Sequence, residues 1–215
     1  MILNRRKQSK SILVTYSNSD SYISDQFRTI RTNIKFLPTD RKNRIFLITS
    51  SGKGEGKSTI AANLAVSIAQ QNEKVLLIDT NIREPMIHDI FNIPNRVGLT
   101  DILTKQATFS EVFYPTGIGD LDIVTSGSTL YNPSELLGNE TMTDLLNGVV
   151  TDYNVVLIDS PNVLDSTETR VLANQCDGVV LVLQRGKTEV EKVYDARRIL
   201  ELAHAKLVGA IINEK

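Results

Sequence analysis

The sequence predicts an α/β fold in which a parallel β-sheet is covered by helices on both faces, giving a three-layer α/β/α domain. Short runs that are apolar throughout recur along the chain, which is typical of strands buried on both faces. Segments with helical patterns lie between most of these runs, as in a parallel sheet. A length of 215 residues suits one such domain with a sizeable core.

Six strands are predicted. Four of them are runs of apolar residues, at 44–50 (RIFLITS), 74–79 (KVLLID), 154–160 (NVVLIDS) and 178–184 (GVVLVLQ). Two more complete the set, at 121–127 (LDIVTSG) and 206–213 (KLVGAIIN). Helices are predicted between them, at 57–71, 139–151 and 188–204.

The N-terminal part divides into an arm and a helix. Residues 1–19 are polar and basic without sustained periodicity, which predicts a flexible arm. The next segment, 20–37, predicts an amphipathic helix ended by Pro38. Its apolar residues recur at spacings of four and three, namely Ile23, Phe27, Ile30, Ile34 and Leu37. We therefore expect a single domain over 20–215 that includes this helix.

Composition narrows the classes of partner. The formal net charge of −1 gives no overall attraction to nucleic acid or anionic lipid, so anion binding must be local. A single cysteine, Cys176, excludes an internal disulfide framework and fits a reducing compartment. No apolar run approaches the roughly 18 residues that span a bilayer, and the N-terminus lacks a signal peptide's apolar core. We expect a cytoplasmic protein whose membrane contact comes through a partner.

A glycine-rich loop, SSGKGEGKST, follows the first buried strand and leads into a helix rich in alanine and leucine. It is close to the phosphate-binding pattern GxxxxGK[ST], with Ser51 at the position of the first glycine and an additional lysine, Lys53. Such loops bind phosphates because consecutive backbone N–H groups point inward and the next helix presents its positive end. Ser51 retains its N–H group, so we expect the loop to bind a nucleotide.

The loop residues have distinct expected roles. Gly54 and Gly56 supply positive φ angles and a close approach of the backbone. Lys57 reaches the β and γ phosphates, and the Ser58 hydroxyl binds Mg²⁺. The remaining predicted nucleotide contacts are Ser51, Gly52, Lys53, Glu55 and Thr59. The alternative is a strand-to-helix turn without a ligand, which the strand and helix on either side disfavour.

Two predicted strands end in aspartate, Asp79 and Asp159. The carboxyl ends of parallel strands flank the ligand crevice of an open sheet, so both aspartates should lie beside the loop. Phosphoryl transfer needs carboxylates near Mg²⁺ and, for a hydroxyl acceptor, a group that takes its proton. We expect both to serve the metal and the chemistry, although either alone could be a helix cap or turn residue.

Several motifs together resemble those of the bacterial tyrosine kinases, cytoplasmic kinases of polysaccharide export systems within the partitioning-type P-loop ATPases. SSGKGEGKST resembles their Walker A loop and VVLIDSPN their Walker B motif. VLLIDTNIREP resembles their second aspartate motif, DxDxRxP. SGSTLYNPSELL resembles a segment particular to the kinases, and DQFRTIRTNI their N-terminal ExxRxxR helix. The resemblance runs from about residue 20 to the end of the sequence.

This resemblance implies a P-loop NTPase fold and an ATP- and Mg²⁺-dependent kinase that phosphorylates protein tyrosine in exopolysaccharide or capsule synthesis. It implies that Asp79 is the general base and that Asp159 is the Walker B carboxylate, with Lys57 and Ser58 on the phosphates and Mg²⁺. It also places Arg83 of the second motif among the catalytic residues and Asn213 against the nucleotide base.

The resemblance further implies the partners. A membrane adaptor would complete the nucleotide site with its cytoplasmic tail, and no adaptor-like segment occurs in this sequence, so a separate protein is expected. Proteins with accessible tyrosines would be substrates. The 20–37 helix would join subunits into a homo-oligomer through Arg28 and Arg31.

Three departures from the family pattern matter. Asn81 replaces the second aspartate of DxDxRxP, which predicts a weakened enzyme. Asp25 replaces the glutamate of ExxRxxR, which predicts a weaker ring because its side chain is shorter. The tyrosine-rich tail of the family does not follow the last strand, so Tyr16 and Tyr22 are the expected acceptors within the chain.

Two other functions stay open at this point. A partitioning-type ATPase switch is possible, because its signature lysine lies one residue before the position of Lys53. A non-catalytic assembly subunit of the export machinery is the other, because Asn81 and the short C-terminus permit lost transfer.

Overall fold

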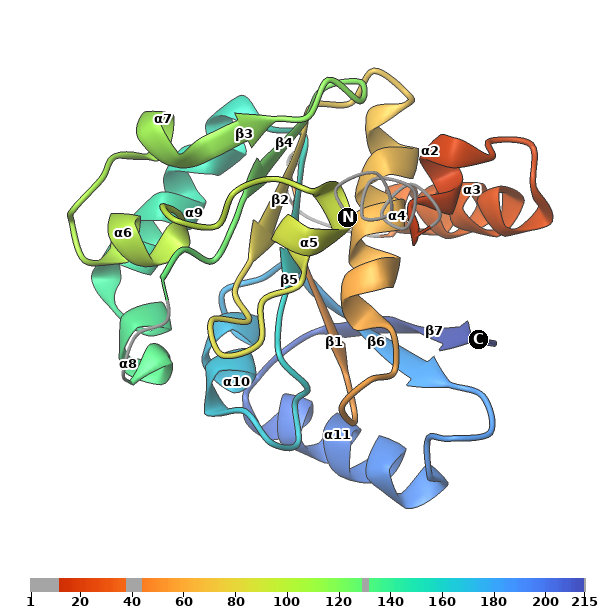
Figure 1. Cartoon of the computed structure of the whole chain (residues 1–215). Coiled ribbons are helices and arrows are strands. Elements are labelled where there is room, and N and C mark those ends of the chain that lie inside the picture. Colours follow the sequence, from red (N-terminus) through yellow and green to blue (C-terminus); the bar gives the residue numbers. More distant parts are fainter. Residues whose placement is uncertain (1–11, 38–43, 129–131, 215) are drawn as a thin grey trace, which may run out of the picture.

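The computed structural model describes residues 12–37, 44–128 and 132–214, and these form a seven-stranded sheet in the order β3-β4-β2-β5-β1-β6-β7 (Figure 1). The strands are β1 (Arg44–Ser50), β2 (Val75–Asp79), β3 (Phe113–Pro115), β4 (Leu121–Val124), β5 (Val155–Asp159), β6 (Gly178–Gln184) and β7 (Leu207–Asn213). All neighbours are parallel except β3 and β4. The six predicted strands are confirmed, with β4 ending earlier than expected.

The central strands are buried on both faces, as their unbroken apolar runs predict. In β1, Ile45 and Leu47 belong to the hydrophobic cluster on one face of the sheet. Phe46 and Ile48 belong to the cluster on the other face. Successive side chains of a strand point to opposite faces, so a strand between two helical layers must be apolar at every position.

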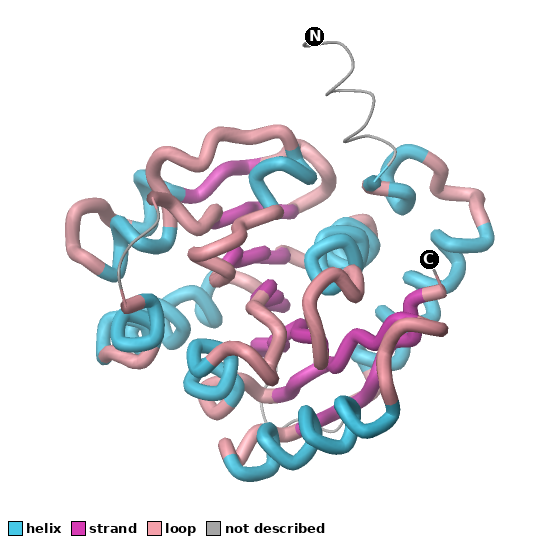
Figure 2. Tube along the Cα trace, turned by 60° about the horizontal axis from the view of Figure 1, so that its bottom comes forward, coloured by secondary structure: helices cyan, strands magenta, loops and turns pink. Residues whose placement is uncertain are grey.

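Helices cover both faces of the sheet, which confirms the three-layer prediction (Figure 2). One cluster packs under α2 (Val14–Ser17), α3 (Tyr22–Lys35), α4 (Lys57–Ala69) and α5 (Ile87–Phe91). The other packs under α6 (Leu99–Leu103), α7 (Phe109–Val112), α8 (Pro133–Leu137), α9 (Glu140–Asp152), α10 (Thr167–Ala173) and α11 (Val190–Leu202). The smaller helices and β3 were not predicted, because segments of three to seven residues carry too little periodicity.

The central helix is α4, in which every residue except Lys57 and Thr59 is buried. Its small and branched side chains, such as Ala61 and Leu64, let it lie close against the sheet. The residue before it, Gly56, has a left-handed backbone with φ of 94°. The start of α4 is therefore anchored in the core, and the preceding loop is held at a defined place.

Residues 12–17 differ from the predicted flexible arm. Leu13 and Thr15 are buried against α4. The Thr15 backbone N–H and hydroxyl both donate to Asn63 Oδ1, at 3.1 and 3.0 Å. Two buried residues are too few to give a helical or strand periodicity in the sequence. The flexible arm was therefore predicted to extend too far along the chain. Residues 1–11 lie outside the described residues.

The predicted 20–37 helix is observed as α3, capped by Ser21, whose hydroxyl accepts from the Ser24 N–H at 3.2 Å. Phe27 and Ile34 are buried, whereas Ile23 is 51% exposed, so the predicted apolar face is only partly covered. Pro38, the predicted end of the helix, lies outside the described residues. Within the described parts, no helix is both long and apolar enough to cross a membrane.

Candidate nucleotide and metal site

The phosphate loop, defined here as residues 51–58, joins the carboxyl end of β1 to α4 (Figure 1). In the sheet, β5 lies between β1 and β2, and Asp79 of β2 and Asp159 of β5 are register partners. Register partners on neighbouring parallel strands lie side by side. The loop and the two predicted aspartates therefore meet at one edge of the sheet.

The two loop glycines have the predicted positive φ angles, 74° at Gly54 and 94° at Gly56. A Cβ on Gly56 would lie 2.4 Å from Asn213 Nδ2, and one on Gly54 would lie 3.0 Å from Lys187 Nζ. The two glycines therefore do more than allow positive φ angles. The absence of a side chain at each also leaves room for Asn213 of β7 and for Lys187, which follows β6.

Ser51 and Glu55 explain why the first glycine of the pattern is absent. Both are buried, and the Ser51 hydroxyl lies 3.0 Å from each carboxylate oxygen of Glu55. The Gly52 N–H donates to Glu55 Oε2 at 2.9 Å. The Thr188 hydroxyl donates to Glu55 Oε1 at 2.5 Å. A glycine at position 51 would leave the buried carboxylate with one donor fewer.

Asp159 is wholly buried, and neither of its carboxylate oxygens has a hydrogen-bond partner among the described residues. Burial raises its pKa, whereas the Lys57 ammonium and the Ser58 hydroxyl act in the opposite direction. The hydroxyl nevertheless forms no hydrogen bond of normal geometry with Asp159. A buried carboxylate without partners is costly unless a cation joins it.

The donor set at this edge fits Mg²⁺. The ion prefers oxygen ligands and is commonly bound by one or two carboxylates together with phosphates and water. Asp159 and the nearby Ser58 hydroxyl supply such oxygens. The described residues contain no group of three or more His, Cys, Asp and Glu side chains able to hold a metal.

Asp79 is also wholly buried, but its oxygens are engaged. Oδ1 accepts from the Asn81 N–H at 3.0 Å, and Oδ2 accepts from the Met86 and Ile87 N–H groups at 3.1 and 3.0 Å. Burial and then the neighbouring Asp159 raise its pKa, and these three N–H groups offset part of the rise. A carboxylate oxygen accepts two hydrogen bonds, so Oδ1 keeps one acceptor site.

Asn81 has a structural role in the loop after β2. Its side-chain Nδ2 donates to the Glu84 carbonyl at 2.7 Å, and its backbone N–H holds Asp79. An aspartate at this position could not donate to the carbonyl unless protonated. The departure from the DxDxRxP pattern thus closes a turn beside the general-base candidate.

Arg83 lies in the same loop but is bound elsewhere. Its Nη2 donates to Glu168 Oε1 of α10 at 3.1 Å, and its side chain is 69% exposed. Nearby, Lys53 of the phosphate loop forms an ion pair with Glu84. The contacts of Arg83 are to α10 and not to the two aspartates, so its predicted catalytic role stays a prediction.

Asn213, predicted to meet the nucleotide base, contacts the phosphate loop. Its Nδ2 donates to the Glu55 carbonyl at 3.1 Å. The sequence did not single out Lys187, Thr188 or Glu168 as site residues. The available signals were a glutamate within the loop and a serine at its first position, which depart from the glycine-rich pattern.

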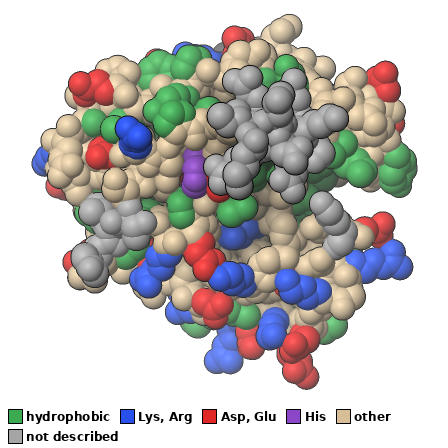
Figure 3. Space-filling view, in the orientation of Figure 1, with side chains coloured by type: hydrophobic (Ala, Val, Ile, Leu, Met, Phe, Trp, Pro, Cys, Tyr) green, Lys and Arg blue, Asp and Glu red, His purple; other side chains and the backbone are tan. Residues whose placement is uncertain are grey.

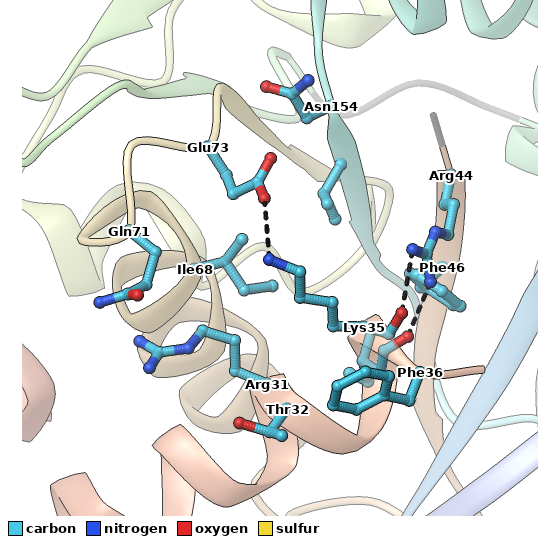
Figure 4. Close-up of a pocket in the computed structure, with 12 residues that line it drawn as sticks. Arg31, Thr32, Lys35, Phe36, Arg44, Phe46, Ile68, Gln71, Glu73 and Asn154 are labelled. Carbon is cyan, nitrogen blue, oxygen red and sulfur yellow. Dashed lines mark hydrogen bonds and ion pairs between the residues drawn. The ribbon is translucent and has the colours of Figure 1, made fainter. Parts of the chain in front are cut away.

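A cavity of about 450 Å³ lies away from this site (Figure 4). Its lining includes Arg44 at the start of β1 and Arg31 and Lys35 of α3, which places it at the opposite edge of the sheet. Lys35 reaches toward Glu73 at 3.8 Å, and Arg44 donates to the carbonyls of Ile34 and Lys35. The cavity is thus separate from the phosphate loop.

The parallel sheet, the phosphate loop at the carboxyl end of β1 and the aspartate that ends β5 define the chain as a P-loop NTPase. The family described as AAA domain matches residues 43–207. Tyrosine-protein kinase YwqD of Bacillus subtilis is 42% identical over 212 residues, covering 99% of this chain and 90% of that protein. The chain therefore belongs to the bacterial tyrosine-protein kinase family, and the resemblance seen in its motifs is confirmed.

Solved structures agree with this assignment. The chimerical protein CapA2B2 has a TM-score of 0.91 and 38% identity, covering 95% of this chain and 90% of the chimera. The kinase domain of Escherichia coli tyrosine kinase ETK has a TM-score of 0.90 and 30% identity, over 94% and 79% of the two chains. In tyrosine-protein kinase ptk of Acinetobacter johnsonii, 32% identical, the match spans 29% of a longer protein.

Proposed function

We propose that this chain transfers the γ-phosphoryl group of Mg·ATP to tyrosine side chains of proteins, in the control of exopolysaccharide or capsule synthesis. The observation that carries the proposal is the buried pair of aspartates beside the phosphate loop, one with engaged oxygens and one without partners. Such a pair suits two separate tasks, binding a cation and accepting a proton.

The roles follow from the contacts. Asp159 and the Ser58 hydroxyl would hold Mg²⁺, which neutralises charge on the phosphates when bound. Lys57 would contact the β and γ phosphates, together with N–H groups of the phosphate loop. Asp79 would accept the tyrosine hydroxyl proton at the acceptor site left on Oδ1, as the tyrosine oxygen bonds to the γ phosphorus and ADP leaves.

The raised pKa of Asp79 supports its role as the base. An ordinary aspartate has a pKa of about 3.9 and is a weak proton acceptor at neutral pH. Burial and the neighbouring Asp159 raise the pKa of Asp79, which brings it closer to the operating pH. The three N–H groups that hold its carboxylate also fix its direction.

The proposal is tested by incubating the purified chain with Mg·ATP and a tyrosine-containing protein, and detecting phosphotyrosine with an antibody and by mass spectrometry. We expect Mg²⁺-dependent phosphotyrosine that disappears when EDTA removes the metal and returns when Mg²⁺ is restored in excess. ATP hydrolysis without phosphotyrosine would instead support a partitioning-type switch. The absence of both phosphotyrosine and ATP hydrolysis, with or without an adaptor segment, would support an assembly subunit.

The switch is the second candidate because of Lys53, which lies beside the signature-lysine position of partitioning ATPases. Here Lys53 forms an ion pair with Glu84 of the same chain. A lysine engaged within its own chain is less available to a neighbour's phosphates, which favours the kinase.

We further propose that a membrane adaptor activates the chain through a cytoplasmic tail. The match of this chain to one part of a longer kinase, ptk of Acinetobacter johnsonii, supports a division of labour between a kinase region and other regions. In the phosphotyrosine assay, adding the cytoplasmic segment of the adaptor should raise the transfer rate. A rate that is independent of every such segment would contradict this part of the proposal.

A homo-oligomer formed through α3 is also proposed. Arg31 donates to the Ser67 carbonyl of its own chain at 2.6 Å, so most of its bonding is internal. Arg28 pairs with Asp25 on the exposed side of the same helix. Arg28 also donates to the Ser19 carbonyl at 2.7 Å, but both of its contacts are exposed, so it is more accessible than Arg31 to a neighbouring copy.

Arg28→Ala is expected to weaken self-association by at least about tenfold in dissociation constant, because arginines at interface centres are frequent hot spots. Light scattering after size-exclusion chromatography, over a range of concentrations, measures this. Lys35→Ala, on the same helix, is the matched control and should associate as the wild type does. Equal association of the Arg28 and Lys35 variants would rule out the proposed contact.

A further inference from the structure

Two side chains, one from the turn after β6 and one from the end of β7, donate hydrogen bonds to backbone carbonyls of the phosphate loop. Lys187 Nζ donates to the Lys53 carbonyl at 2.9 Å and to the Gly54 carbonyl at 3.1 Å. Asn213 Nδ2 donates to the next carbonyl, that of Glu55, at 3.1 Å. Three consecutive carbonyls are therefore directed toward the same side.

This arrangement determines where the N–H groups point. All described peptide bonds are trans, and in a planar trans peptide the C=O of one residue and the N–H of the next point in opposite directions. With the three carbonyls directed toward β6 and β7, the N–H groups of Gly54, Glu55 and Gly56 point away from them. Among the described residues, none of these three N–H groups donates to a protein acceptor.

The side chain of Glu55 makes a second connection between the phosphate loop and the turn after β6. Glu55 is 2% exposed, and its carboxylate accepts from the Thr188 hydroxyl at 2.5 Å. The Thr188 oxygen itself accepts from the Gln184 N–H at 2.8 Å, which leaves its proton for Glu55. Ser51 and the Gly52 N–H complete the set of donors.

Lys187 and Thr188 are placed by a tight turn at the end of β6. Gly186 has φ of 74°, and the N–H groups of Lys187 and Thr188 both donate to the Gln184 carbonyl, at 3.1 and 2.9 Å. Figure 3 shows charged side chains of both signs over the region of α11, which begins just after this turn. The rest of that surface carries local pairs, such as Lys192 with Glu189, whereas Lys187 is directed to the loop.

We propose that Lys187 and Thr188, acting through Glu55 and the loop carbonyls, are positioning residues that set the phosphate loop in its anion-binding conformation before nucleotide binds. This inference rests on the proposed function, since it supplies the N–H groups that the phosphates of Mg·ATP would contact. The free direction of three neighbouring N–H groups is the observation that points to an anion. Gly54 and Gly56 suit this conformation because both have positive φ angles, and a Cβ on either would approach Lys187 or Asn213.

The test is calorimetric titration of the full chain with Mg·ADP. Lys187→Met and Thr188→Val should each raise the dissociation constant by about tenfold, because each loses hydrogen bonds that orient the loop. Thr188→Ser retains the hydroxyl and should bind within about threefold of the wild type. Lys192→Met, a matched lysine on α11, should bind as the wild type does. Thr188 carries no charge, so its variant separates loop geometry from the loss of positive charge near the phosphates.

Two further readouts distinguish positioning from general stability. In phosphotyrosine transfer, Thr188→Val should raise KM for ATP by about tenfold and change kcat by less than about threefold. Thermal unfolding of Thr188→Val without ligand should remain cooperative. Lys187 is exposed, so Lys187→Met leaves the core intact. Unaltered binding of Mg·ADP by both variants, in a wild type that binds it, would overturn the inference alone. A wild type that binds no Mg·ADP would overturn the proposed function and this inference with it.

Discussion

The Asp159→Asn variant is expected to be more stable than the wild type without metal and to lose its response to Mg²⁺. Asp159 is wholly buried beside Asp79, and its oxygens have no partner among the described residues. Removing its charge removes a desolvation cost and a like-charge repulsion. Burial raises the pKa of Asp159 to about 6, and one unit of pKa shift is worth about 1.4 kcal/mol, so we expect a gain of about 3 kcal/mol in the free energy of unfolding at pH 8.

The pH dependence has a definite sign. Burial raises the pKa of both Asp79 and Asp159, so the folded chain binds these protons more tightly than the unfolded chain. The stabilisation is fully present below the ordinary carboxyl pKa of about 4 and is lost as the pH rises through the raised values. Metal-free wild type should therefore unfold at a lower temperature at pH 8 than at pH 5.5, and Asp159→Asn should reduce this difference.

Thermal unfolding with and without Mg·ADP measures both effects. Mg·ADP at about 100 times its dissociation constant should stabilise the wild type by about 2.7 kcal/mol, and the variant by much less. Phosphotyrosine transfer should fall by about 100-fold or more. Asp165→Asn, in the exposed part of the same β5–α10 loop, is the control and should change stability by less than about 0.5 kcal/mol. A variant that retains the full Mg²⁺ response would remove Asp159 from the metal site.

Asp79→Asn is expected to lower kcat for phosphotyrosine transfer by about 1,000-fold, within the usual range for loss of a general base. The wild-type kcat should rise with pH through the pKa of Asp79, which burial and Asp159 raise, because the base must be deprotonated. The residual kcat of the variant should lack this rise with pH. KM for ATP should change by less than about threefold, since Asp79 acts on the acceptor and not on the phosphate loop.

The same substitution has a structural cost that must be measured beside it. Asparagine has a single acceptor oxygen, so at least one of the N–H groups of Asn81, Met86 and Ile87 would lose its partner. A buried unsatisfied N–H costs about 1–3 kcal/mol, which offsets the relief of charge repulsion. Asp89→Asn, on α5 and exposed, is the matched control for both kinetics and stability. Retention of kcat in Asp79→Asn would exclude Asp79 as the base.

The sequence predicted the layers and the strands because burial on both faces requires apolar residues at every position of a strand, as in β1 and β5. It missed β3, a three-residue edge strand that is only partly buried. It also placed the end of the flexible arm too late, because the contacts of Thr15 with Asn63 join residues 48 positions apart. Local patterns do not encode such distant partners.

The sequence could place those candidate residues that stand at strand ends or at a helix start. Lys57, Ser58, Asp79 and Asp159 do so, and the topology of the sheet alone brings them together. Lys187 and Thr188 belong to an ordinary polar turn, and only the tertiary structure directs them to the phosphate loop. Arg83 illustrates the opposite case, since its motif suggested catalysis and its observed partner is Glu168.

The burial of α4 bears on how quickly nucleotide exchanges. Elements with dense buried contacts open only with global unfolding, whereas exposed loops open at little cost. The phosphate loop is continuous with α4, whose residues are buried except for Lys57 and Thr59, so we expect this wall of the site to move little during turnover. We therefore expect product release to depend more on the loop that follows Asp79. The exposed ion pair between Lys53 and Glu84 joins the phosphate loop to the segment that follows Asp79, and because exposed ion pairs contribute little to stability, it opens at little cost.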